Sequence, residues 1–146
     1  MRLVVDTSVL VGELLRASGR ERLADDRLDL FLPERMWEEA KVELPRRIAA
    51  FVRRRGLDRS ISDELVVACV DAIDANIVVM DEAIYSPLED EAVARSLRDR
   101  SDWPVVASAL ALNAGIWTND NDFLGTGIAT WTTDTIKSWL ERHPST

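Results

Sequence analysis

The chain has 146 residues, of which 47% are hydrophobic and 30% are charged; this balance predicts a single folded domain over residues 1–146 and excludes a disordered chain. No apolar run approaches the roughly 20 residues of a membrane helix, so we expect no membrane contact. The single cysteine, Cys69, lies in an apolar stretch and is expected to be an unpaired buried thiol, which fits a reducing, cytoplasmic setting. The net charge of −8 argues against nucleic acid as a partner, unless the acidic residues gather at a site for divalent cations.

The chain begins with a predicted strand, a polar turn and a helix. Residues 3–5 form a short apolar run that is rich in valine, and apolar residues recur at helical spacing from Val9 to Leu15. Asp6 lies between these two elements. It therefore follows the first strand, at the edge where parallel α/β sheets place their functional groups.

A second strand over residues 28–32 is followed by a helix that starts near Pro33, and Pro45 is expected to end or kink this helix. A further helix is expected up to Gly56, in the only strongly basic segment of the chain. Its arginines are either an exposed charged face or contacts for nucleic-acid phosphates. They are Arg46, Arg47, Arg53, Arg54 and Arg55.

The rest of the chain continues to alternate between helices and strands. Helices are expected over residues 62–75, 86–97, 103–112 and 133–142, and strands over residues 77–80, 115–117 and 128–131. Strands that alternate with helices favour parallel pairing with helices on both faces of the sheet. The sequence thus predicts a three-layer α/β/α domain with a mainly parallel sheet of four to five short strands.

Acidic residues recur close to the expected strand ends. Asp6 ends the first strand, Glu39 lies in the helix after the second, Asp102 precedes a helix, and Asp120 and Asp122 follow the fourth strand. If these segments converge, their oxygens form a hard anionic site that suits Mg²⁺ or Mn²⁺, whereas the soft ligands that favour zinc are absent.

Each acid also has a simpler interpretation. Asp6 and Asp102 could cap the helices that follow them, and Asp120 and Asp122 could be turn residues. The glutamate is the least certain member, because Glu38, Glu39 and Glu43 lie in one segment and Glu39 and Glu43 share a helix face.

Four segments together resemble the PIN domain family. They are VDTSVL at residues 5–10, WEEA at 37–40, DWPVVASAL at 102–110 and TNDNDF at 118–123. Each segment alone is a weak signal, but their order and spacing match the family over nearly the whole chain.

The resemblance implies a metal-dependent endoribonuclease, often the toxin of a toxin–antitoxin pair, that forms a homodimer and can bind a cognate antitoxin protein. It implies Asp6, Glu39, Asp102 and Asp120 as the catalytic metal ligands, with Asp122 as a supporting ligand. The neighbouring polar residues Thr7, Ser8, Thr118 and Asn119 are expected to orient these carboxylates. By position beyond Pro33, Glu39 is preferred to Glu43.

Two other functions stay open at this point. Asp6 could be a phosphoryl-accepting nucleophile of a phosphatase-like enzyme, although such sites need a lysine late in the chain, and Lys41 and Lys137 do not follow strands. Alternatively, an inactive PIN-like domain could serve only to bind a partner protein.

Overall fold

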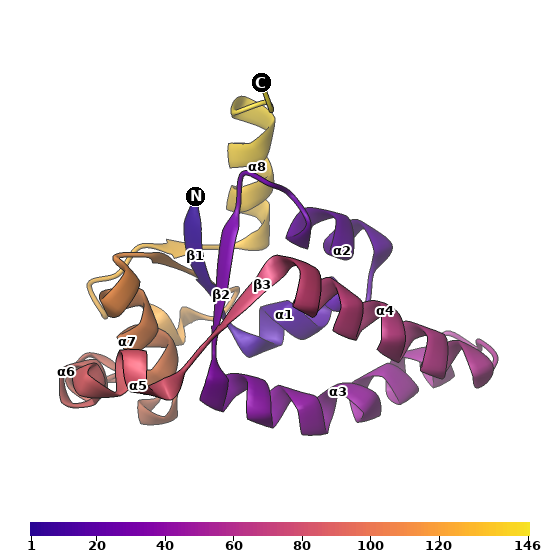
Figure 1. The fold of residues 1–146 in the computed structure, drawn as a ribbon, viewed down its shortest axis with the longest axis horizontal. Helices are drawn as coiled ribbons and strands as arrows, with labels where there is room; N and C mark the ends of the chain where they lie inside the picture. The colour runs from indigo at the N-terminus through magenta and orange to yellow at the C-terminus, as the bar shows by residue number, and fades with distance from the viewer.

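The centre of the structure is a parallel five-stranded sheet in the order β3-β2-β1-β4-β5 (Figure 1). A computed structural model describes all residues from 1 to 146. The strands are β1 (Arg2–Val5), β2 (Asp29–Pro33), β3 (Ile77–Met80), β4 (Gly115–Trp117) and β5 (Thr130–Trp131). The strand order reverses between β1 and β4, which is where open α/β sheets form their ligand crevice.

Helices cover both faces of this sheet, which confirms the predicted three-layer α/β/α fold. The helices are α1 (Thr7–Leu14), α2 (Ala17–Leu23), α3 (Glu34–Arg54), α4 (Ser60–Asn76), α5 (Glu82–Tyr85), α6 (Glu89–Arg95), α7 (Trp103–Leu112) and α8 (Thr133–Arg142). Three 3-10 turns are η1 (Ser86–Leu88), η2 (Arg100–Asp102) and η3 (Asn121–Phe123). In Figure 1, α5, α6 and α7 lie on one side of the strands, and α1, α2 and α4 lie on the other.

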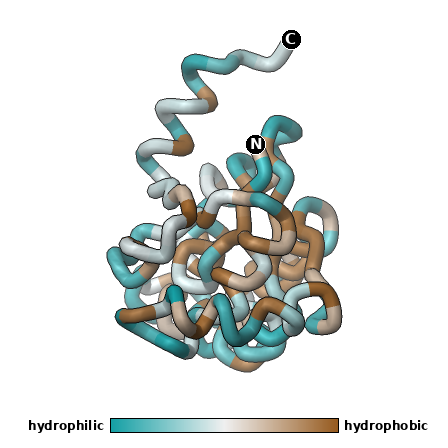
Figure 2. The backbone as a smooth tube through the Cα atoms, turned by 90° about the vertical axis from the view of Figure 1, so that its left-hand side faces the viewer, coloured by the Kyte–Doolittle hydropathy of each residue, from teal (hydrophilic) through white to brown (hydrophobic).

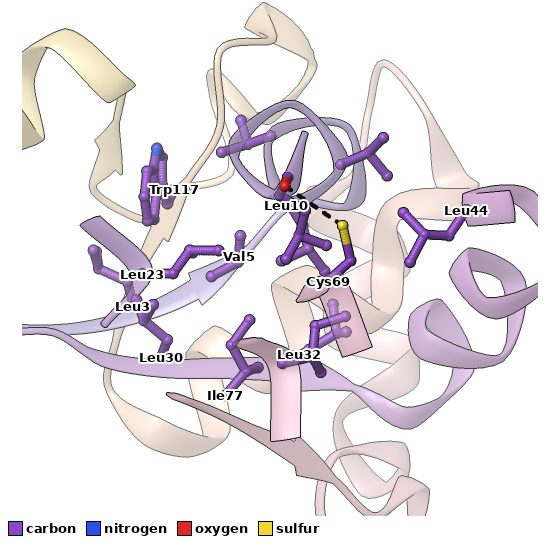
Figure 3. Close-up of a cluster of buried hydrophobic side chains, with 14 of the residues drawn as sticks. Leu3, Val5, Leu10, Leu23, Leu30, Leu32, Leu44, Cys69, Ile77 and Trp117 are labelled. Atoms are coloured by element: carbon purple, nitrogen blue, oxygen red, sulfur yellow. Dashed lines mark hydrogen bonds between the residues drawn. The ribbon is translucent and has the colours of Figure 1, made fainter. Parts of the chain in front are cut away.

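The inner strands are apolar because their side chains enter two separate cores, one on each face of the sheet. Leu3 and Val5 point into a core under α1, α2 and α4, whereas Val4 points to the opposite face and packs under α7. Cys69 of α4 is fully buried in the first core, where its thiol donates to the Leu14 carbonyl at 3.4 Å (Figure 3). Burial raises the pKa of this thiol, as expected for a structural cysteine.

Helix α3 continues through Pro45, so the prediction of two helices divided at this proline was wrong. A proline in a helix interior removes one backbone hydrogen bond and introduces a steric clash. The helix continues because a buried stripe at four-residue spacing holds both halves against the core. This stripe consists of Ala40, Leu44, Ile48 and Val52.

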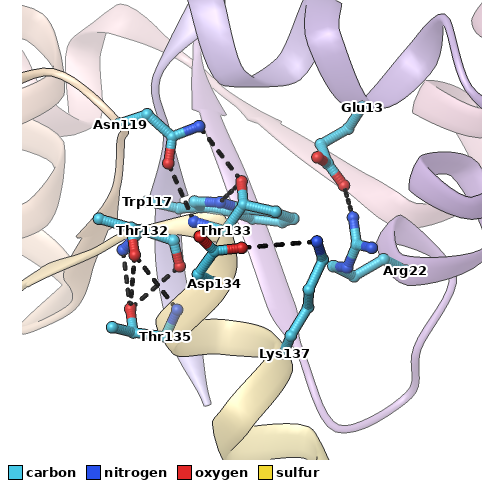
Figure 4. Close-up of polar contacts among 9 residues, drawn as sticks. All are labelled: Glu13, Arg22, Trp117, Asn119, Thr132, Thr133, Asp134, Thr135 and Lys137. Carbon is cyan, nitrogen blue, oxygen red and sulfur yellow. Dashed lines mark hydrogen bonds and ion pairs between the residues drawn. The ribbon is translucent and has the colours of Figure 1, made fainter.

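A tight corner joins α1 to α2, a short polar helix that the sequence did not predict. Gly19 is buried there, and a Cβ atom at this position would lie 2.1 Å from the Glu13 carbonyl oxygen, so only glycine allows the two helices to approach so closely. The buried Glu13 carboxylate pairs with Arg22 across the corner (Figure 4). Arg16 lies in this corner, directly before α2.

Three smaller details differ from the predictions. The helix expected over residues 86–97 is divided into η1 and α6 and ends at Arg95, and the fifth strand contains only Thr130 and Trp131.

Figure 2 shows the C-terminal helix α8 projecting from the body of the molecule. None of the helices combines the length and the apolar character that a bilayer span requires.

Candidate metal-binding and catalytic site

A pocket of about 300 Å³ opens beside the carboxyl ends of β1 and β4, and acidic side chains line most of it. We call it the acidic pocket. Its acids are Asp6, Glu43, Asp99, Asp102, Asp120 and Asp122. The predicted convergence of the strand-end aspartates is therefore present in the structure, and two further acids, Asp99 and Glu43, join them.

Asp6 does not cap the helix that follows it, and two hydroxyl groups hold its carboxylate at the pocket. Its carboxylate makes no capping hydrogen bond to α1. Instead it accepts hydrogen bonds from the hydroxyls of Ser8 at 3.0 Å and Thr118 at 2.9 Å. Because Asp6 follows β1 and Thr118 follows β4, the pairing of these two strands sets the geometry of the carboxylate.

Thr118 also connects Asp6 to the next acid along the chain. The backbone N–H of Asp120 donates to the Thr118 hydroxyl at 3.0 Å, and the Asp120 carboxylate accepts from the N–H of Asp122 at 3.0 Å. Asp120 thus does form the turn that its position suggested. The same turn carries Asp122 to the pocket wall.

Asp99, Asp102 and Asp122 form the tightest group of acids. One oxygen from each carboxylate lies within 4.8 Å of the others, a spacing compatible with a shared cation. Asp102 precedes α7 but makes no capping hydrogen bond, which leaves its oxygens available. Asp99 caps η2 by accepting from the backbone N–H of Ser101 at 2.9 Å.

Burial and the crowding of negative charge raise the pKa of two of these acids. Burial, with help from the surrounding charges, raises the pKa of Asp102 to about 7. The neighbouring carboxylates that contribute are Asp99, Asp6, Asp122 and Asp120. Burial and the Asp120 charge raise the pKa of Asp122, whereas hydrogen bonds from Ser101 lower the pKa of Asp99. Without a cation, Asp102 is therefore substantially protonated near neutral pH.

The glutamate on the pocket wall is Glu43. It lies four residues after Glu39, on the same face of α3, and one turn before Arg47, which also lines the pocket. Glu39 is exposed and does not line the pocket, and Glu38 is paired with Lys41 at 2.7 Å. The structure thus places the less preferred candidate of the sequence analysis at the site.

The four predicted supporting residues divide into two pairs. Ser8 and Thr118 bond to Asp6, as described above. Thr7 lines the pocket, but its buried hydroxyl has no hydrogen-bond partner. Asn119 contacts none of the carboxylates; its side chain bonds to Thr133 and fastens the start of α8 (Figure 4).

Asp99 was missed because it follows no strand. The only signal for it was its position three residues before Asp102, within one turn of chain. No lysine lines the acidic pocket, so the phosphatase-like interpretation of Asp6 lacks the lysine that such sites need.

Comparison with known protein families gives one match that covers nearly the whole chain. The sequence profile of the PIN domain matches residues 4–141. This range includes every residue of the acidic pocket. A search of curated protein sequences gave no match.

Proposed function

The chain belongs to the PIN domain family, and we propose on this premise that it is a Mg²⁺- or Mn²⁺-dependent endoribonuclease that hydrolyses phosphodiester bonds. PIN domains are generally nucleases. The observation that carries the proposal is the gathering of strand-end carboxylates around Asp6 in one pocket. A cluster of like charges around the buried Asp6 is costly in an apoprotein, and it is understandable where cations neutralise it.

The residues present fit a hard divalent cation. The pocket offers carboxylate oxygens and contains neither histidine nor cysteine. The unpartnered hydroxyl of Thr7 is a further polar group that a hydrated cation would satisfy. Asp6, Asp99, Asp102 and Asp122 would hold the ion, with Asp120 beside them.

A divalent cation at this site would activate a water molecule and stabilise negative charge on phosphate oxygens. The chain supplies the remaining parts. Ser8 and Thr118 fix the Asp6 carboxylate before substrate arrives. Arg47, on the pocket wall, is placed to bind a phosphate that the carboxylates alone would repel. Asp102 would be one of the residues that hold the cation, whose positive charge would favour the ionised form of this carboxyl.

Nuclease assays with single substitutions test this proposal. Purified protein should cleave single-stranded RNA with Mg²⁺ or Mn²⁺ and stop when EDTA is added. Asp6→Asn should lower the rate by about 100-fold or more, because loss of a direct ligand exceeds the 10- to 100-fold effect of outer groups. Asp74→Asn is the matched control, since Asp74 is exposed on α4 and forms no ion pair. Undiminished cleavage by Asp6→Asn, with its fold verified by circular dichroism, would refute the mechanism.

We further propose that the protein is a homodimer and the toxin of a toxin–antitoxin pair. The family resemblance supports both statements. The exposed valines Val67, Val78 and Val79 on α4 and the edge strand β3 offer apolar area for protein contacts. Light scattering should then report about twice the 16.4 kDa chain mass. A small adjacent gene that encodes a DNA-binding protein would support the toxin assignment, and co-expression should abolish cleavage.

A further inference from the structure

A second hollow, of about 400 Å³, adjoins the acidic pocket between α1 and the second half of α3. We call it the basic hollow. Its polar wall consists of four arginines, Arg16, Arg47, Arg54 and Arg55, and its lining also includes Phe51 and Gly12. No acidic side chain lines it. Arg47 belongs to both walls, so the two hollows meet at this residue.

The four arginines have no partners of opposite charge. The six ion pairs of the molecule use other cations, and all four side chains of the hollow are exposed. In a chain with a net charge of −8, four unpaired positive charges around one concavity form a local field of the opposite sign. This field favours an anion, and guanidinium groups match phosphate oxygens in shape.

The spacing along α3 extends this surface away from the acidic pocket. Three lining residues follow Arg47 at helical spacing: Phe51 after four residues, Arg54 after seven and Arg55 after eight. This spacing places all of them on one helix face. From Arg47 to Arg55 the helix rises about 12 Å, the length of a few nucleotides of a single strand. A chain of phosphates that starts at the acidic pocket can therefore continue along this face.

The floor of the hollow also suits an unpaired base. Phe51 is half-buried, and the Arg55 guanidinium lies 5.0 Å from the centre of its ring. Aromatic rings and guanidinium planes are surfaces on which bases of single-stranded RNA stack. On the opposite wall, a Cβ atom at Gly12 would meet nothing within 4 Å, so this glycine leaves the hollow open.

We propose that the basic hollow binds the phosphates and one base of the single-stranded RNA next to the cleaved bond. The inference rests on the proposed nuclease function and names the part of the substrate that this surface recognises. It also divides the basic residues of this segment into those that line the hollow and those that do not. Arg47, Arg54 and Arg55 bind RNA together with Arg16 from the α1–α2 corner. Arg46 lies outside the hollow, and Arg53 lines a different one with Arg59.

RNA binding by adjacent arginine variants provides the test. A fluorescent oligoribonucleotide is titrated with the full chain carrying Asp6→Asn in Mg²⁺, so that bound RNA is not cleaved. Arg54→Ala should weaken binding about 3- to 10-fold and lower the slope of log affinity against log salt by about 0.7. Arg53→Ala removes the same charge from the neighbouring position and should change affinity less than about two-fold. Equal effects of both substitutions would overturn the inference.

Two further variants are informative. One tests whether the shape of the basic hollow matters apart from its charge, and the other tests whether RNA binding by the hollow can be distinguished from cleavage at the acidic pocket. Gly12→Leu adds no charge and should weaken binding by filling the wall, with folding verified by circular dichroism. In the active protein, Arg54→Ala should raise KM for a long RNA several-fold more than Arg53→Ala does. Cleavage of long RNA that is equally efficient in Arg53→Ala and Arg54→Ala would refute the inference but not the nuclease function.

The remaining outcomes are also decisive. Arg54-dependent RNA binding by a protein that never cleaves RNA would support the hollow and refute the nuclease proposal. Binding of a glutamate-rich peptide that depends on Arg54, without Arg54-dependent RNA binding, would assign the hollow to an acidic protein partner and overturn the inference.

Discussion

The acidic pocket and the basic hollow meet at Arg47, but they are built in different ways. In the acidic pocket, Asp6 is buried and fixed by two hydroxyl donors, and Asp120 is fixed by the turn that follows β4. In the basic hollow, the arginines are exposed and carry no ion pairs. Under the proposed function, the carboxylates that hold a cation must be rigid, and the sheet fixes them, whereas a flexible nucleic-acid strand needs only positive charge along its path.

After the loss of Asp6 itself, the largest effect is expected where a side chain only positions a pocket carboxylate. Thr118→Val keeps the shape of the residue but removes the hydroxyl that bonds to Asp6 and receives the Asp120 N–H. We expect a 10- to 100-fold loss of activity or Mn²⁺ affinity, as for other groups that orient metal ligands. Initial-rate kinetics and calorimetric titration measure this. Thr118→Ser, which keeps the hydroxyl, should retain most activity; an equal loss would locate the defect in packing.

The next effect concerns the stability of the metal-free protein. Asp102 has a pKa near 7 in the folded chain, above its ordinary value of 3.8, so folding favours the protonated form. Its stabilising contribution is complete below about pH 4 and is lost as the pH rises through 7. In EDTA, Asp102→Asn should raise the free energy of unfolding by about 2 kcal/mol at pH 8, after discounting for solvent screening, and by less than half as much at pH 5.

Thermal unfolding at both pH values measures this difference, and Mg²⁺ should stabilise the unsubstituted chain more than the variant. Asp134→Asn is the control, since Asp134 lies outside the acidic pocket. A stabilisation that is equal at pH 5 and pH 8 would show that the ionised, partly buried Asp102 carboxylate is not its cause.

A smaller effect distinguishes the two glutamates on one face of α3. Glu43→Gln should reduce activity about ten-fold, in the range of a removed outer ligand, whereas Glu39→Gln should change it less than about two-fold. The reason is that Glu43 lines the acidic pocket and Glu39 does not. Rates at saturating Mn²⁺ compare them directly. Greater sensitivity at Glu39 would mean that the helix turns further toward the pocket when cations bind.

The smallest effect is expected at the junction of the two hollows. Pro45 lies between Glu43 and Arg47 in the interior of α3 and is exposed. Pro45→Ala restores a helix donor and should stabilise the protein by about 1 kcal/mol, less than the full propensity difference because the local backbone has adapted to proline. Chemical denaturation measures this gain. Unchanged kcat and RNA affinity are expected; a loss of either would show that the proline sets the angle between the two surfaces.

The sequence predicted the parts of the site that depend on local pattern. Asp6 could be placed because a short buried strand and a helix flank it, and strand ends of parallel sheets share one edge. The glutamate could not be chosen, because Glu39 and Glu43 share a helix face and only the packing of α3 against α1 determines which one reaches the pocket. Likewise, Arg16 lines the basic hollow from the corner between α1 and α2, which the sequence did not predict.

The failure at Pro45 has a similar cause. Local propensity favours a break there, but the buried stripe on both sides of the proline outweighs the loss of one backbone hydrogen bond. The polar helix α2 escaped prediction because its seven residues have no apolar periodicity.

The hydrogen bond between Asp6 and Thr118 spans 112 residues, and this has a consequence for synthesis on the ribosome. Strands β1 and β2 can pair as soon as the first part of the chain has emerged, but β1 must wait for β4 before its other edge is covered. Until residues 115–122 leave the exit tunnel, Asp6 has no Thr118 to orient it, and Asp120 and Asp122 are absent from the pocket. A nascent chain therefore lacks a complete acidic pocket until residues 115–122 have emerged, and under the proposed nuclease function this delay keeps RNA near the ribosome from being cleaved by an unfinished chain.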